Sequence, residues 1–135
     1  MSISISIIIT AFNEERNIRE AFLDIQKASI NLNLNYEIII INDCSQDNTK
    51  IEIEKIIKEF NNVELINNKI NQGPGESFNI GVRKASSDIV FWISGDRDVD
   101  ALEYLKHINL FEKYDLICFY IKNPKERILF RRFVS

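Results

Sequence analysis

Short apolar runs alternate with amphipathic segments along most of the chain. The runs are rich in isoleucine and other β-branched residues, which is typical of strands buried on both faces. They cover residues 3–9, 37–41, 63–66, 89–93 and 116–120. Between them, apolar residues recur at spacings of three and four, which predicts helices. The predicted helices cover residues 14–30, a segment capped by Asp47 or Asn48, 76–85 and 101–110.

This alternation predicts an α/β fold with a mostly parallel sheet and helices on both faces. We expect a single domain over residues 1–135. Polar segments follow three of the strands, at residues 10–13, 42–45 and 94–98. In parallel sheets, ligands bind beyond the carboxyl ends of the strands. The three polar segments should therefore converge on one site.

Composition narrows the function classes. With 17 basic and 20 acidic residues, the net charge is −3, which argues against a nucleic-acid binder. Cys44 and Cys118 lie too far apart in sequence to form a metal-binding motif, and they favour a reducing, cytoplasmic setting. The first residues have no features of a signal peptide, and no apolar run approaches the roughly 20 residues of a membrane span.

An acidic cluster follows the strand at 89–93. Asp96, Asp98 and Asp100 alternate there, and carboxylates held close together repel one another unless a cation is present. Oxygen ligands suit Mg²⁺ or Mn²⁺, particularly when phosphates complete the coordination. In the alternative interpretation, the cluster is a solvated loop in which Asp98 or Asp100 caps the helix that begins near Ala101.

Two other segments carry candidate binding residues. Asp43 directly follows a strand and either accepts hydrogen bonds from a nucleobase or ribose, or belongs to a simple turn. Gly73 and Gly75 precede a helix, where their amides could face a phosphate. Gly81 lies inside the same predicted helix at a cost of about 1 kcal/mol relative to alanine, which indicates close packing or close ligand approach.

Together these segments resemble the family 2 glycosyltransferases, which have the GT-A fold. Thr10-Ala-Phe-Asn-Glu14 is similar to the family's "P-A-Y-N-E" turn, and residues 37–49 are similar to "E-I-I-V-V-D-D-G-S-x-D-x-T". Asn71-x-Gly73 followed by Asn79-x-Gly81 resembles "N-x-G-x-x-x-A-x-N-x-G". Residues 88–96 resemble the strand that leads to the metal-binding "D-x-D". The resemblance covers residues 3 to 100.

The resemblance implies a Rossmann-like domain that binds a nucleoside diphosphate sugar, linked to UDP or GDP, together with Mg²⁺ or Mn²⁺. The implied nucleotide-sugar residues are Ala11, Phe12, Asn13, Glu14, Asp43, Gly73, Gly75, Ser94 and Gly95. The implied metal ligands are Asp96 and Asp98. Ser94 stands where the family has the first aspartate of "D-x-D", and Asn42 replaces the first aspartate of "D-D". Serine is a neutral, weaker ligand, so we expect looser metal binding.

The implied reaction is a metal-assisted, inverting transfer of a sugar to an acceptor, either a polyprenyl phosphate or a glycan. Family members have a further acceptor-binding part with a general base, and we expect residues 1–135 to lack it and to bind donor with little transfer. We identify no catalytic residue. The alternatives are a non-catalytic nucleotide-sugar-binding or regulatory domain, and a nucleotidyltransferase, which is disfavoured because residues 10–13 contain no glycine-rich basic loop. Residues 122–133 mix basic and apolar side chains, and either contact an anionic membrane surface, such as the cytoplasmic face of the inner membrane, or pack on further chain.

Overall fold

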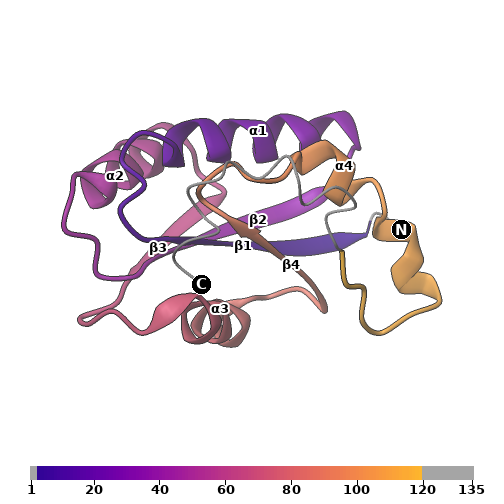
Figure 1. Ribbon diagram of the computed structural model, residues 1–135. Coiled ribbons are helices and arrows are strands. Elements are labelled where there is room, and N and C mark those ends of the chain that lie inside the picture. Colours follow the sequence, from indigo (N-terminus) through magenta and orange to yellow (C-terminus); the bar gives the residue numbers. More distant parts are fainter. Residues whose placement is uncertain (1–2, 120–135) are drawn as a thin grey trace, which may run out of the picture.

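The fold is built on a parallel sheet of four strands. In the computed structural model, which describes residues 3–119, the strands lie in the order β3-β2-β1-β4 (Figure 1). They are β1 Ser4–Ala11, β2 Asn35–Asn42, β3 Val63–Asn67 and β4 Ile89–Ser94. Every pairing among them is parallel, and the predicted mostly parallel α/β fold is confirmed.

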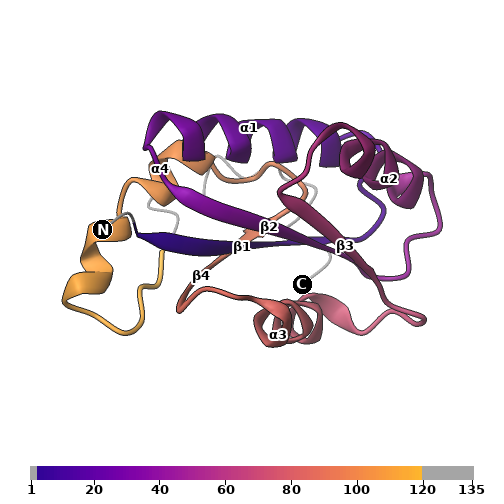
Figure 2. The ribbon, with the colours of Figure 1, turned by 180° about the vertical axis from the view of Figure 1, so that it is seen from behind.

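Helices cover both faces of this sheet. They are α1 Ile18–Asn31, α2 Thr49–Glu59, α3 Gly73–Lys84, α4 Ala101–Leu105 and the 3₁₀ helix η1 Ile108–Glu112. Figures 1 and 2 show α1, α2 and α4 above the sheet and α3 alone below it. No helix within residues 3–119 is both long and apolar enough to cross a bilayer. The membrane contact predicted for residues 122–133 lies outside the described part of the chain.

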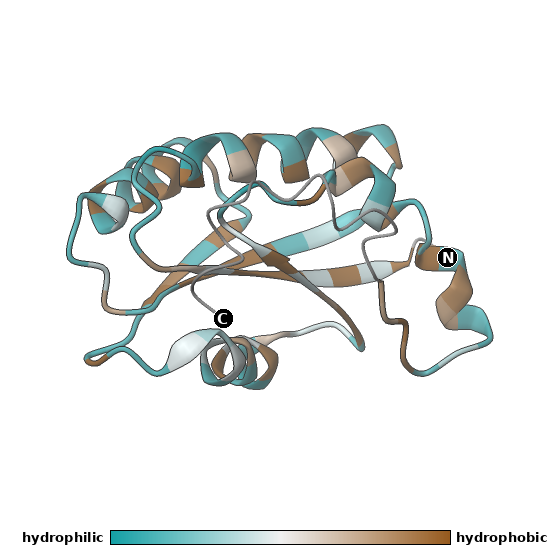
Figure 3. Cartoon of the chain, viewed as in Figure 1, coloured by the Kyte–Doolittle hydropathy of each residue, from teal (hydrophilic) through white to brown (hydrophobic). Residues whose placement is uncertain are grey.

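The isoleucine runs form a core on each side of the sheet. Side chains alternate between the two faces of a strand. Ile7 and Ile9 of β1 therefore pack under α1, whereas Ile8 packs with Ile39 and Ile41 on the side of α3. Figure 3 shows the same division in α1, which is hydrophobic toward the sheet and hydrophilic outside. Burial on both faces explains why these strands contain few polar residues.

Gly81 lies where α3 crosses β1. A Cβ atom at this position would be 2.5 Å from Cγ2 of Ile8 and 2.9 Å from its Cδ1. The prediction that Gly81 marks a close approach is therefore confirmed, and the approach is between the helix and the sheet rather than to a ligand. This contact sets how closely α3 lies under the strands.

The structure differs from the predicted elements in three places. The predicted helix 101–110 ends at Leu105 and continues, after a turn, as η1. Ala101, Leu105 and Ile108 are all buried, so a helical spacing persists although the backbone tightens. Residues 116–119 form no strand with any described segment, and Leu116 is 78% exposed. The helix predicted from residue 14 begins at Ile18, after a turn in which the backbone N–H groups of Asn17 and Ile18 donate to the carbonyl oxygen of Glu14.

Candidate functional site

Three strand ends and one loop enclose a cavity of about 320 Å³. Thr10 of β1 pairs in register with Ser94 of β4, and Ala11 pairs with Asn42 of β2, so the strands end at the same level. The cavity is lined by Thr10, Ala11, Phe12, Glu14, Asp43, Asn71, Gly73, Pro74 and Ser94. The predicted convergence of the three polar segments on one site is therefore found in the structure.

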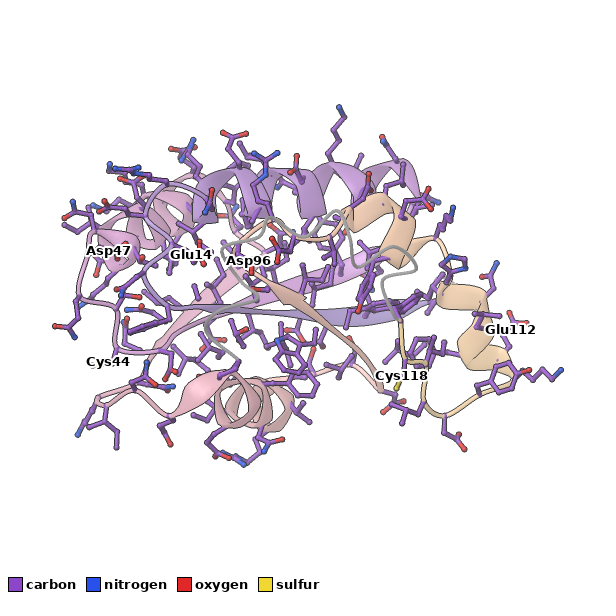
Figure 4. The ribbon with its side chains drawn as sticks, viewed as in Figure 1. Glu14, Cys44, Asp47, Asp96, Glu112 and Cys118 are labelled. Carbon is purple, nitrogen blue, oxygen red and sulfur yellow. The ribbon has the colours of Figure 1, made fainter. Side chains whose placement is uncertain are left out.

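The cavity includes many of the predicted nucleotide-sugar residues, but not all of them. Ala11, Phe12, Glu14, Asp43, Gly73 and Ser94 line it. Asn13, Gly75 and Gly95 do not, although each lies within two residues of a lining position. Figure 4 shows Glu14, Cys44, Asp47 and Asp96 at the same end of the sheet, and Glu112 and Cys118 at the opposite end.

Asp43 organises the wall of the cavity formed by residues 68–77. Its Oδ1 accepts hydrogen bonds from Asn68 Nδ2 at 2.7 Å and from the Gln72 amide at 2.9 Å, and its Oδ2 accepts from the Gly73 amide at 2.8 Å. The residue is buried, with 3% of its surface exposed. Both carboxylate oxygens are thus engaged in fixing the loop that precedes α3.

The pKa of Asp43 follows from these contacts. Burial raises the pKa of this carboxyl, but hydrogen bonds from Asn68, Gln72, Gly73 and Ser77 lower it by more, so that the pKa lies below its ordinary value of 3.8. At neutral pH the cavity therefore contains a buried, ionised and immobile carboxylate.

Reciprocal hydrogen bonds join the loop after β1 to the loop after β2. The Asn13 amide donates to Ser45 Oγ at 3.0 Å, and Asn13 Oδ1 accepts from the Gln46 amide at 2.8 Å. The Glu15 amide donates to Asp47 Oδ2, and Glu15 Oε2 accepts from the Asn48 amide. These bonds hold two irregular loops together where no strand pairing is possible, and they fix the position of Phe12 and Glu14.

Each of the three strand ends contains a non-glycine residue in the left-handed region. The φ angles are 55° at Asn13, 60° at Cys44 and 62° at Arg97. Such conformations are unfavourable for most side chains and gather at functional sites. Cys44 stands where the resembling motif has glycine, which adopts this conformation without strain.

We therefore expect Cys44→Gly to raise the free energy of unfolding by about 0.5–1 kcal/mol, because it removes the cost of a left-handed side chain. The loss is small, since Cys44 Sγ makes only a 3.5 Å contact to the carbonyl oxygen of Lys69. Urea denaturation of both proteins measures the change. Cys44→Ala keeps Cβ and is the matched control, which should show no gain; equal stabilisation by both variants would contradict the strain explanation.

The metal-binding prediction is only partly matched by the loop after β4. Ser94 lines the cavity, but Asp98 lines a second cavity of about 650 Å³ between α1 and the start of α4. The expectation that Asp98 compensates for Ser94 is not matched, because the left-handed turn at Arg97 directs the chain toward α1. Within residues 3–119, no three His, Cys, Asp or Glu side chains are grouped as metal ligands. The role of Asp96 stays a prediction.

Capping explains the third aspartate of the cluster. Asp100 is the N-cap of α4, and its Oδ1 accepts a hydrogen bond from the Glu103 amide at 3.0 Å. Of the two capping candidates, Asp100 is thus confirmed. Before α2, Asp47 Oδ1 accepts from the Thr49 amide at 2.9 Å, although Asn48 occupies the cap position.

Several residues of the site have no signal in the hydrophobic pattern. Thr10, Asn71 and Pro74 line the cavity, and their only sequence signal is their place within the polar motifs. Asn68 and Ser77 are buried side chains behind Asp43, and Asn68 Nδ2 lies 3.0 Å from Ser77 Oγ. Nothing in periodicity distinguishes such supporting residues from other polar residues of a loop or helix.

Sequence comparison finds glycosyltransferase relatives. The chain is 26% identical over 112 residues to a dolichyl-phosphate beta-glucosyltransferase of Trichomonas vaginalis, covering 78% of this chain and 35% of that protein. It is 35% identical over 99 residues to a poly-beta-1,6-N-acetyl-D-glucosamine synthase of Staphylococcus aureus, covering 71% of this chain and 22% of that protein. The chain therefore spans well under half the length of these relatives.

Solved structures show the same fold. A mannosyltransferase of Pyrobaculum calidifontis, PcManGT in complex with GDP-Man and Mn²⁺, matches with a TM-score of 0.75 at 17% identity, over 93% of this chain and 37% of that one. Staphylococcus aureus TarS in complex with UDP matches with a TM-score of 0.67 at 21% identity, over 82% and 32% of the two chains. The fold is that of the GT-A glycosyltransferases.

The family itself follows from a match along nearly the whole chain. Residues 6–132 match glycosyl transferase family 2. This span contains β1, both joined loops, the wall held by Asp43 and the loop after β4. The chain belongs to glycosyl transferase family 2.

Proposed function

We propose that this chain is the donor-binding part of a glycosyltransferase that transfers a sugar from a nucleoside diphosphate sugar. The observation that carries the proposal is the cavity in which the ends of β1, β2 and β4 meet the loop before α3. Its place at the carboxyl edge of a parallel sheet is where ligands bind in such folds. Relatives whose structures contain UDP or GDP-Man support the class of ligand.

The nucleoside is assigned to the wall that Asp43 organises. Asn71 and Gly73 form this wall opposite the exposed ring of Phe12, which is 45% exposed. An amide side chain and a fixed carboxylate offer both donors and acceptors to a base edge. The aromatic ring offers a face on which a base can stack.

The diphosphate is assigned to the side of the cavity formed by Ser94 and the loop that contains Asp96. Mg²⁺ is commonly held by one or two carboxylates together with substrate phosphates. One carboxylate, that of Asp96, and the hydroxyl of Ser94 fit an ion held mainly by the donor itself. Such an ion would stabilise the charge that develops on the leaving diphosphate.

In the proposed reaction, an acceptor oxygen attacks the anomeric carbon while the bond to the diphosphate oxygen breaks, which inverts the configuration. A hydroxyl acceptor must lose its proton to a base, whereas a phosphate acceptor is already anionic. The dolichyl-phosphate relative supports a polyprenyl phosphate acceptor, and the polysaccharide synthase relative supports a glycan. Of these we favour the polyprenyl phosphate.

Calorimetric titration of the chain with UDP and GDP, each with and without Mn²⁺, tests donor binding. We expect one nucleotide to bind, and to bind more tightly with Mn²⁺. Ser94→Asp should strengthen the Mn²⁺-dependent binding about tenfold, because it adds a charged ligand, whereas Ser94→Ala should not. If neither nucleotide binds with or without the metal, the donor-binding proposal is wrong.

The alternative is a non-catalytic nucleotide-sugar-binding or regulatory domain, favoured by Ser94 in the position of the first motif aspartate. Incubating the chain with UDP-glucose or GDP-mannose and a short polyprenyl phosphate separates the two, with the glycolipid product followed by mass spectrometry. We expect residues 1–135 to bind donor with little transfer. Rapid turnover by this chain alone would overturn that expectation and remove the alternative.

A further inference from the structure

The loop between β4 and α4 is attached to α1 by an ion pair. Arg97 Nη2 lies 2.8 Å from Asp24 Oδ2, and Arg97 Nε donates to the same oxygen at 3.0 Å. Asp24 belongs to the middle of α1, far from the strand ends in sequence. The pair spans the cavity of about 650 Å³ that separates α1 from residues 97–102.

The backbone of this loop is not in an intrinsically preferred conformation. Its last bond to the sheet is donated by the Gly95 amide to the carbonyl oxygen of Thr10 at 3.0 Å. Two residues later, Arg97 adopts a φ of 62°, which most side chains avoid. The ion pair with Asp24 holds Arg97 in this conformation.

The same turn sets the position of Asp96. Asp96 Oδ1 accepts a hydrogen bond from the Asp98 amide at 3.1 Å, across the left-handed residue between them. The side chain of Arg97 is directed to α1, while Ser94, two residues before Asp96, faces the smaller cavity. Fixing Arg97 therefore fixes the turn in which the Asp96 carboxylate takes part.

We propose that Asp24 and Arg97 are positioning residues for the metal–diphosphate side of the donor site: their ion pair fastens the loop to α1 and holds Asp96 in place. This inference rests on the proposed donor-binding function. The two residues act through the loop and touch neither donor nor metal. Partners that orient a metal ligand typically affect metal affinity tenfold or more.

An exposed ion pair contributes little to global stability, and the side chains of Asp24 and Arg97 are 49% and 45% exposed. Asp24→Ala should therefore fold normally. A matched control exists on the same helix: Arg19 of α1 pairs with Glu59 of α2 at 2.6 Å, with exposures of 36% and 47%. Glu59→Ala removes a comparable pair that lies outside the loop after β4.

The test measures UDP and GDP affinity by calorimetry, with and without Mn²⁺. We expect Asp24→Ala to weaken Mn²⁺-dependent nucleotide binding about tenfold and to leave binding without Mn²⁺ unchanged, while Glu59→Ala changes neither. The charge-swapped variant D24R/R97D should regain most of the loss, since aspartate tolerates the left-handed conformation. Equal weakening with and without the metal, or no recovery in the swapped variant, would overturn the proposal.

Hydrogen exchange of the free chain separates this inference from the proposed function. Asp24→Ala should speed exchange of the Asp98 amide, whose bond to Asp96 depends on the turn, and Glu59→Ala should not. Unchanged exchange in Asp24→Ala, with nucleotide binding to the wild type intact, would overturn the ion pair's role alone. Absence of nucleotide binding to the wild type would overturn the donor-binding function, and the proposed role of the pair with it.

Discussion

Replacing Gly81 by alanine is expected to lower the free energy of unfolding by about 2 kcal/mol, although alanine is the better helix former. The added Cβ would lie 2.5 Å from Cγ2 of Ile8. Ile8 is fully buried in β1, with strands on both sides, and so has no room to retreat. The clash can be relieved only by moving α3 away from the sheet, which opens part of the core.

Gly75→Ala is the matched control, because it makes the same change in the same helix where a Cβ would meet nothing within 4 Å. We expect it to be neutral or to stabilise the protein by up to about 1 kcal/mol. Urea denaturation compares the two variants. Ile8→Ala combined with Gly81→Ala should cost less than the sum of the single changes, since the new methyl group enters the space that Ile8 leaves. Strict additivity would show that the glycine is not required by this contact.

Gly81 also shows what sequence reasoning can reach. A glycine inside an amphipathic helix is unfavourable unless something lies close to it, so close approach was predictable, but the partner was not. The isoleucine runs likewise predicted four buried strands, because burial on both faces leaves little choice of residue type. Polar residues directly after such runs predicted the edge at which the cavity lies, since parallel strands end together.

Side-chain direction at the strand ends was not predictable. Asp96 and Asp98 look equivalent in the sequence, yet the left-handed turn at Arg97 places Asp98 against the cavity at α1. Arginine has no special tendency toward that conformation, and what holds it is Asp24, which is distant in sequence. The supporting role of Asn68 and Ser77 depends in the same way on contacts that form only after folding.

The segment from residue 101 onward differs for another reason. Buried residues at Ala101, Leu105 and Ile108 suit an α helix, and also an α helix that tightens into a 3₁₀ helix. The apolar run at 116–120 has the composition of a strand, but a strand also requires a partner to pair with. Composition supplies the first condition and carries no information on the second.

Asp43→Asn is expected to lower the free energy of unfolding by about 3 kcal/mol and to abolish nucleotide binding. The carboxylate accepts on both oxygens, from Asn68 and Gln72 on one and from Gly73 on the other. An asparagine presents an N–H group to one of these donors in either orientation. The loop before α3, which forms a wall of the cavity, would then lose its attachment to β2.

Glu37→Gln is the matched comparison at the opposite end of the sheet. Glu37 accepts from Ser6 Oγ and from the Ser86 amide and hydroxyl, all on Oε1. Because a single oxygen receives these bonds, the amide oxygen of glutamine can replace it. We expect a smaller loss of stability, about 1 kcal/mol, and unchanged nucleotide binding.

The pH dependence of stability distinguishes a charged network at Asp43 from simple packing. The pKa of Asp43 is lowered on folding, so the stability that it contributes is complete above its ordinary value of 3.8 and is lost as pH falls through the lower folded value. The difference in unfolding free energy between wild type and Asp43→Asn should therefore be largest at neutral pH and shrink below about pH 4. Urea denaturation at a series of pH values measures it. A difference that stays constant down to the lowest pH at which the protein folds would mean that the ionised carboxylate is not what holds the loop.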